Sequence, residues 1–297
     1  MGTLAEMLST PLGVIEWFVY LLAAVMFVIG LHLMNSPKTA RKGNMVSAIG
    51  MVFAVAMAFI VLFAGEASNG FKHGVAVIVL IVGIVIGAVA GVVSAKKVKM
   101  TDMPQLVSVF NTVGGGAAAL VALNDILTSA ETPSIVVLIT AGLGIMIGSV
   151  TFSGSLIAAG KLQGIKWVKK LSLPGKGFWN ILFVVLTIVS FVMLCVQPNQ
   201  RLLWSILTTV FALCYGLVFV IPIGGADMPV VISVLNACTG TAVAMSGLAI
   251  NNIALIVAGA LVGAAGVTLS IAMSKAMNRP LLSVLAGCLL YTSDAAD

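Results

Sequence analysis

Two segments of this sequence place an acid, a proline and an asparagine at the same spacing. Asp102 precedes Asn111 by nine positions, and Asp227 precedes Asn236 by nine positions, within the shared pattern D-M-P-x-x-x-S-V-x-N. The second segment follows the first by 125 positions, which indicates an internal duplication. A carboxylate can bind a proton, whereas an amide at physiological pH only donates and accepts hydrogen bonds. These two segments are the predicted functional centre of the chain.

The composition indicates whether the chain folds in water or in a lipid bilayer. Charged residues make up 8% of the chain, against about a quarter in soluble domains, and hydrophobic residues make up 61%. The mean hydropathy is +1.20. Apolar runs of roughly 20 residues recur, each long enough to cross the ~30 Å hydrocarbon core of a bilayer. The predicted fold class is therefore an all-α polytopic membrane protein.

The apolar runs predict about nine transmembrane helices. Pro104 and Pro229 suit the first turn of a helix, where the missing N–H costs nothing. The first run is long enough to span and has no Lys or Arg before it, so we predict a retained helix rather than a secretory signal. The predicted spans are residues 12–34, 44–64, 74–95, 104–124, 134–160, 178–197, 201–222, 228–248 and 252–273.

The distribution of Lys and Arg predicts the orientation. Of the 15 basic residues, all but Lys72 and Arg201 fall in alternate loops that would share one side of the membrane. Cytoplasmic loops carry the excess of Lys and Arg, so the N-terminus is expected outside and the C-terminus in the cytoplasm. The duplicated segments open the fourth and eighth spans, which makes the repeat parallel and places both acids at the cytoplasmic face. Topology explains the positive charge, so no nucleic-acid partner is expected.

The duplicated asparagines are expected deep in the bilayer. Nine residues of helix span about 13–14 Å, so acids at the headgroup level place Asn111 and Asn236 near the middle of the membrane. An unpaired amide in hydrocarbon is costly, so both should face the interior of the bundle. Two interpretations remain open: hydrogen bonds between helices, or a polar pathway. The fifth span adds four hydroxyls that could line a file of water or bond back to their own helix: Ser149, Thr151, Ser153 and Ser155.

The remaining polar and small residues have structural alternatives. Asp102 and Asp227 could cap the positive N-termini of their helices, or could interact with a cytoplasmic domain. Glycines at small-x-x-x-small spacing, such as Gly259 and Gly263, predict close helix packing. The chain has only two histidines and four isolated cysteines, so no metal site is expected.

Several motifs together resemble one known family, the beta subunit of proton-translocating NAD(P) transhydrogenase. The resemblance runs in order from about residue 13 to residue 287, and its motifs are specific. They are S-P-K-T-A-R-K-G-N at 36–44, K-M-T-D-M-P at 99–104, G-S-V-T-F-S-G-S at 148–155, I-G-G-A-D-M-P at 223–229 and K-A-M-N-R at 275–279.

The resemblance implies a function and a set of site residues. In this family one soluble domain binds NAD(H), another binds NADP(H), and hydride passes between the nicotinamides while the membrane domain moves protons. By position in the motifs, Asn111, Ser155 and Asn236 would lie along the proton pathway, and Asp102, Asp227 and Arg279 would couple it to the soluble domains at its cytoplasmic end. The glycines Gly259, Gly263 and Gly266 would pack the last span.

The sequence departs from the family in two places. Some members have a histidine where this chain has Asn111, and there the histidine is the buried proton carrier. Because this chain lacks the histidine, the resemblance points to a titratable group on a partner subunit. After Gly287 the family continues into its NADP-binding domain. Residues 288–297 of this chain do not resemble the family. We therefore predict a transmembrane proton-translocating domain over residues 1–287 and an atypical, foreign or truncated tail over 288–297.

These features predict a component of an enzyme complex, with no hydride-transfer residue and no bound cofactor or metal in this part. The expected partners are the alpha subunit that carries the NAD-binding domain, membrane lipid and a second copy of the complex. The resemblance implies the bacterial cytoplasmic (inner) membrane. Two other function classes stay open from the residues alone: a proton-coupled secondary transporter built on a parallel repeat, with a solute between Asn111 and Asn236, or a membrane scaffold for a soluble enzyme.

Overall fold

The computed structural model describes residues 10–64, 70–129, 132–170, 175–278 and 280–281. In this part of the chain the regular structure is entirely helical, and nine helices are long and apolar enough to cross a membrane. The predicted fold class of an all-α polytopic membrane protein is thereby confirmed. The helices form two compact units, which divide between Met100 and Thr101.

The first unit contains α2 (Pro11–Met34), α3 (Ala40–Ala64) and α4 (Gly70–Lys97). Thr10 caps α2, because its Oγ1 accepts a hydrogen bond from the Gly13 amide at 3.1 Å. Helices α2 and α3 pack closely where two glycines meet: a β-carbon on Gly43 would lie 2.5 Å from the Gly30 carbonyl oxygen. Such close backbone contact is the usual way in which apolar helices associate in lipid.

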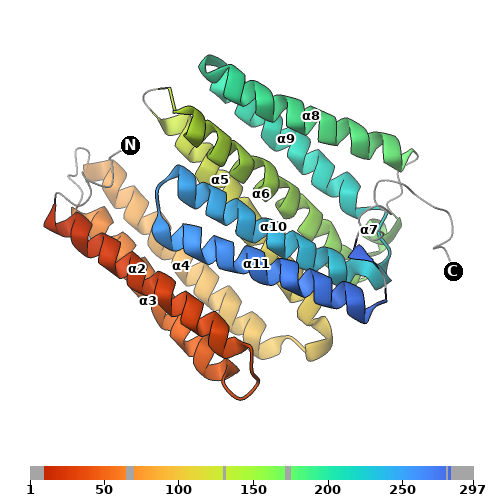
Figure 1. Cartoon of the computed structure of the whole chain (residues 1–297), viewed down its shortest axis with the longest axis horizontal. Coiled ribbons are helices and arrows are strands. Elements are labelled where there is room, and N and C mark those ends of the chain that lie inside the picture. The colour runs from red at the N-terminus through yellow and green to blue at the C-terminus, as the bar shows by residue number, and fades with distance from the viewer. Residues whose placement is uncertain (1–9, 65–69, 130–131, 171–174, 279, 282–297) are drawn as a thin grey trace. The chain divides into compact units, whose positions relative to one another are not determined.

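The second unit contains seven helices in chain order. Figure 1 shows α11, α10, α6, α9 and α8 following one another across this unit, and α5 packs against both α6 and α10. Helices α6 and α10 are the most buried of the spans. The helices are α5 (Met103–Thr128), α6 (Ile135–Leu162), the short α7 (Lys166–Lys170), α8 (Lys176–Val196), α9 (Arg201–Val220), α10 (Met228–Ala249) and α11 (Ile253–Ala276).

The turns that end α6 and α10 use residues that tolerate the left-handed region. Gly164 has φ 74°, and the following Ile165 amide donates to the Gly160 carbonyl at 3.0 Å. Asn251 has φ 55° after α10, and Asn252 then caps α11 by accepting from the Leu255 amide at 3.0 Å. Both ends are typical helix terminations, because glycine and asparagine adopt this backbone conformation at low cost.

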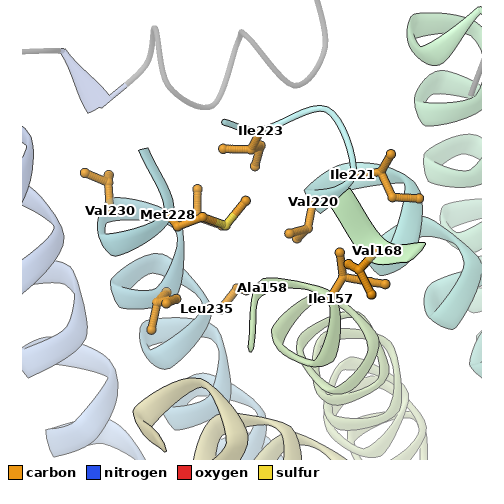
Figure 2. Packing of buried hydrophobic residues seen from close by; sticks show 11 residues of the cluster. Ile157, Ala158, Val168, Val220, Ile221, Ile223, Met228, Val230 and Leu235 are labelled. Carbon is orange, nitrogen blue, oxygen red and sulfur yellow. The ribbon is translucent and has the colours of Figure 1, made fainter. Parts of the chain in front are cut away.

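A buried apolar cluster closes the unit at the end where α10 begins, called the Asp227 end below. Figure 2 shows side chains from α6, α7, α9 and α10 converging there. Met228, Val230 and Val231 of α10 are fully buried in it. The labelled members are Ile157, Ala158, Val168, Val220, Ile221, Ile223, Met228, Val230 and Leu235. The cluster fixes the start of α10 against the ends of α6 and α9.

Candidate functional site

The interior junction of α5, α6 and α10 holds the first duplicated asparagine. Asn111 is 5% exposed, and its Nδ2 donates to the Ile232 carbonyl of α10 at 3.3 Å. In an α-helix this carbonyl also accepts from the amide of residue 236. The Asn111 side chain therefore bonds to the same carbonyl that serves the Asn236 peptide N–H.

Two serines extend this junction to α6. The Ser108 hydroxyl donates to the Ser155 carbonyl at 2.7 Å, and the Thr112 hydroxyl donates to the Ser108 carbonyl at 3.0 Å. Ser155 is fully buried, yet its own Oγ has no hydrogen-bond partner among the described residues. A buried hydroxyl without a partner is uncommon, because desolvating it without compensation costs about 1–3 kcal/mol. The Ser155 hydroxyl is therefore placed to bind a water molecule.

Two other hydroxyls of the α6 group, those of Thr151 and Ser153, bond back to their own helix. Thr151 donates to the Ile147 carbonyl at 2.9 Å, and Ser153 donates to the Ser149 carbonyl at 3.1 Å. Ser149, Thr151 and Ser153 are all buried. The back-bonding alternative thus describes Thr151 and Ser153, whereas Ser155 does not bond back to its helix within the described structure.

The second copy of the repeat has a different environment from the first. Asn236 is only half-buried, and its side-chain amide makes no hydrogen bond to any described residue. Ser233, which corresponds to Ser108, donates back to the Val230 carbonyl at 2.8 Å instead of reaching another helix. The two segments therefore share a sequence pattern but make different contacts: of the two, only the first donates described side-chain hydrogen bonds to another helix.

A second link between α5 and α10 comes from Ser246, which the sequence analysis did not single out. Its hydroxyl donates to the Ala118 carbonyl at 3.0 Å and to the Ala242 carbonyl at 2.9 Å. A β-carbon on Gly144 of α6 would lie 2.7 Å from the Ser246 Oγ. The two links occur in the same order along both helices, so α5 and α10 run parallel. A lone serine in an apolar run gives no sequence signal for this role.

Glycines bring the backbones of α10 and α11 into contact. A β-carbon on Gly266 would lie 2.6 Å from the Ala237 amide nitrogen, and one on Gly259 would lie 2.7 Å from the Gly240 carbonyl oxygen. At Gly263 the nearest atom, the Thr241 amide nitrogen, would be 3.5 Å away, an ordinary contact. Gly240, absent from the predicted set, is tighter: its β-carbon would lie 2.7 Å from the Gly259 carbonyl oxygen and closer still to the Gly263 amide nitrogen.

The two acids of the repeat lie at the Asp227 end. Each occupies the N-cap position of its helix, after a short 3₁₀ turn, but neither Asp102 nor Asp227 makes a side-chain capping hydrogen bond in the described structure. Asp102 is exposed and Asp227 is half-buried. Arg279, the third predicted residue of this group, lies outside the described residues. Both acids lie where a negative charge interacts favourably with the positive N-terminus of a helix dipole.

A lysine at the same end makes contacts that its sequence position does not reveal. The Lys161 Nζ donates to the carbonyls of Val220 at 3.2 Å and Ile223 at 2.9 Å, and also to that of Ile221. These carbonyls lie at and beyond the C-terminus of α9. The sequence indicates only a role in topology for this lysine, because its partners are some 60 positions away.

The polar groups of the junction can donate and accept hydrogen bonds. The junction supplies amides, hydroxyls and backbone carbonyls, and its named side chains include no acid or base. In the part of the chain that the structure describes, no three His, Cys, Asp or Glu side chains form a group that could hold a metal ion.

The comparisons with known proteins agree with the motifs. Two relatives from Rhodospirillum rubrum, both named NAD(P) transhydrogenase subunit beta, are 38% identical to this chain over 275 residues. The alignment covers 90% of this chain and 57% of each relative, so the chain spans little more than half of their length. The sequence model of one family, described as NAD(P) transhydrogenase beta subunit, matches residues 16–297. The resemblance is thereby confirmed, and the chain belongs to the NAD(P) transhydrogenase beta subunit family.

Proposed function

We propose that this chain forms the membrane part of a proton-translocating NAD(P) transhydrogenase. In this proposal, proton movement through α5, α6 and α10 is coupled to hydride transfer between NAD(H) and NADP(H), which bind to soluble domains. Family membership supports the transhydrogenase assignment. The single observation that supports the pathway is the buried junction of three helices, where Ser108 and Asn111 of α5 donate to the Ser155 carbonyl of α6 and the Ile232 carbonyl of α10.

In the proposed pathway, this chain orders water rather than carrying the proton on its own side chains. The unbonded Ser155 hydroxyl can donate to or accept from a water molecule. The Asn111 amide is held by its bond to the Ile232 carbonyl, which leaves its side-chain oxygen as an acceptor. Asn236, one helical turn beyond that carbonyl, extends the polar surface along α10. Together these groups would replace part of the hydration that a proton loses in an apolar interior.

A titratable group from another chain completes this pathway. Neither asparagine nor serine changes its ionisation state at physiological pH, so we place the buried proton carrier on the alpha subunit. At the Asp227 end, Asp102, Asp227 and Arg279 are proposed to meet the docked NADP-binding domain. A charge at this boundary can change partners as the domain moves, which would open or close the pathway.

The continuity of the helices favours a pump over a solute transporter. Secondary transporters with repeats typically bind their substrate at interrupted helices near the middle of the membrane. Here α5 is helical over Met103–Thr128, α6 over Ile135–Leu162 and α10 over Met228–Ala249, without a break. The junction therefore offers side chains and few free backbone groups, which suits water better than a solute.

The proposed setting is the bacterial cytoplasmic membrane, with the N-terminus outside and the C-terminus in the cytoplasm. The excess of Lys and Arg in alternate loops supports this orientation. The proposed partners are the alpha subunit with its NAD-binding domain, a second copy of the complex, and membrane lipid. No nucleotide is proposed to bind to the membrane part itself.

Reconstitution of the assembled complex into sealed vesicles tests this function. Hydride transfer from NADPH to an NAD analogue is started outside the vesicles, and internal pH is followed with a trapped dye. The proposal predicts a pH change that an uncoupler abolishes, together with faster hydride transfer once the uncoupler is present. Hydride transfer with no pH change, or a pH change driven only by a solute gradient, would contradict it.

A further inference from the structure

Lys161 binds a group of backbone carbonyls that belong to the connection between α9 and α10. Its Nζ lies 3.2 Å from the Val220 oxygen and 2.9 Å from the Ile223 oxygen, with Ile221 as a third acceptor. An ammonium group has three N–H donors. Each of the three oxygens can therefore accept an N–H from the ammonium group, and the contacts join the end of α6 to a segment some 60 positions away.

The physical reason for this contact lies in how α9 ends. The last carbonyls of a helix have no partner within the helix, and they carry the negative end of its dipole. Here they lie beside the apolar cluster of Figure 2, where Val220, Ile221 and Ile223 are buried. A half-buried ammonium group satisfies these carbonyls with charge-assisted bonds, which are stronger than neutral ones.

The bound segment leads directly to Asp227. After Ile223 come Gly224 and Gly225, which are exposed, and a β-carbon on either would meet nothing within 4 Å. The Asp227 amide then donates to the Gly224 carbonyl at 3.2 Å, which closes the turn before α10. Lys161 thus holds the part of this short connection that follows α9. The part that precedes α10 carries Asp227.

We propose that Lys161 is a positioning residue for domain coupling: by binding the carbonyls of Val220, Ile221 and Ile223, it sets where Asp227 meets the docked domain. This inference rests on the proposed function and adds a residue to it. When Lys161 holds the segment, movement of the domain is transmitted to α10. Without it, the two glycines let the segment move independently of the helices.

The first test measures the position of the segment. Ile223→Cys introduces a reporter thiol at a buried position of the segment, and its labelling rate with a maleimide is measured in the detergent-solubilised complex, with the same complex lacking the reporter as background for the native cysteines. Lys161→Met should raise the rate about tenfold, since the lost bonds are to a charged group. Lys161→Arg, which keeps charge and donors, should restore most of the protection. Lys166→Met, which removes an exposed lysine nearby, should change nothing.

The second test measures coupling in sealed vesicles, because a merely structural lysine would not affect it. In the Lys161→Met complex, hydride transfer should continue while fewer protons move per hydride, and Lys161→Arg should recover the ratio. If Lys161→Met does not accumulate in the membrane, both tests use Lys161→Gln, which keeps N–H donors without the charge. Its labelling rate and its ratio of protons to hydride should then be intermediate. Unchanged labelling and an unchanged proton ratio would overturn the role of Lys161 alone. Absence of proton movement in the unmodified complex would overturn the proposed function as well.

Discussion

Asn111 and Asn236, the two duplicated asparagines, meet at one backbone carbonyl. The Asn111 Nδ2 lies 3.3 Å from the Ile232 oxygen, which is also the helical acceptor for the Asn236 amide. One copy of the repeat therefore reaches across to the other copy, while the Asn236 side chain stays half-buried without a hydrogen bond in the described structure. We propose different roles for the two residues in the pathway: Asn111 joins the helices and offers its side-chain oxygen to water, and Asn236 binds water or a partner chain.

Asn236→Asp should change proton movement without preventing assembly. A charged carboxylate in the middle of a span costs about 2.5–3.5 kcal/mol, so the new group would bind a proton over the working pH range or recruit water. We expect proton movement to fall about tenfold and to become strongly pH-dependent. The measurement is the pH profile of proton uptake in vesicles. Asn251→Asp, at the exposed turn after α10, is the matched control and should behave as the unmodified complex.

Ser155→Ala should separate transport from stability. The Ser155 Oγ has no partner among the described residues, so its removal leaves no described group unsatisfied and should change the unfolding free energy by less than about 0.5 kcal/mol. Proton movement should nevertheless fall about tenfold, since the pathway loses a water-binding hydroxyl. Thermal unfolding in detergent and proton uptake are measured on the same sample. Ser153→Ala removes a back-bonded hydroxyl of the same helix and should leave proton uptake unchanged.

Gly240→Ala should weaken the packing of α10 on α11 far more than Gly263→Ala. The added methyl group at Gly240 would collide with the backbone of Gly259 and Gly263, whereas at Gly263 it would make an ordinary contact at 3.5 Å. We expect a loss of about 1–3 kcal/mol at Gly240, the usual cost of overpacking, and less than about 1 kcal/mol at Gly263. Unfolding temperature and membrane yield report the difference. Equal losses at both positions would contradict the observed geometry.

The membrane spans could be predicted from the sequence, because hydropathy and proline position determine where a helix can cross a bilayer. The span predicted at 228–248 is observed as Met228–Ala249, and the one at 104–124 as Met103–Thr128. The span predicted from residue 44 belongs to a helix that already begins at Ala40, since Arg41 and Lys42 are helical outside the apolar run. Charge marks the edge of hydrocarbon, whereas backbone hydrogen bonds mark the end of a helix.

Contacts between helices could not be predicted in the same way. The two asparagines have the same sequence context, yet among the described residues only the Asn111 side chain bonds to another helix, because the neighbours of α5 and α10 differ. Lys161 was interpreted through its charge, and Ser246 gave no signal at all; both act on carbonyls of distant segments. A backbone carbonyl has no sequence signature, so its partners emerge only from the packing.

Proton uptake per hydride in the Asn111→Ala complex tests the central claim most directly. The substitution removes the amide that joins α5 to the Ile232 carbonyl, and Asn124→Ala on the exposed face of the same helix is its control. Both complexes are reconstituted into sealed vesicles, and hydride transfer and internal pH are followed together. We predict that Asn111→Ala lowers the ratio of protons to hydride about tenfold while Asn124→Ala leaves it unchanged. A normal ratio in an assembled Asn111→Ala complex would contradict a proton pathway at this junction.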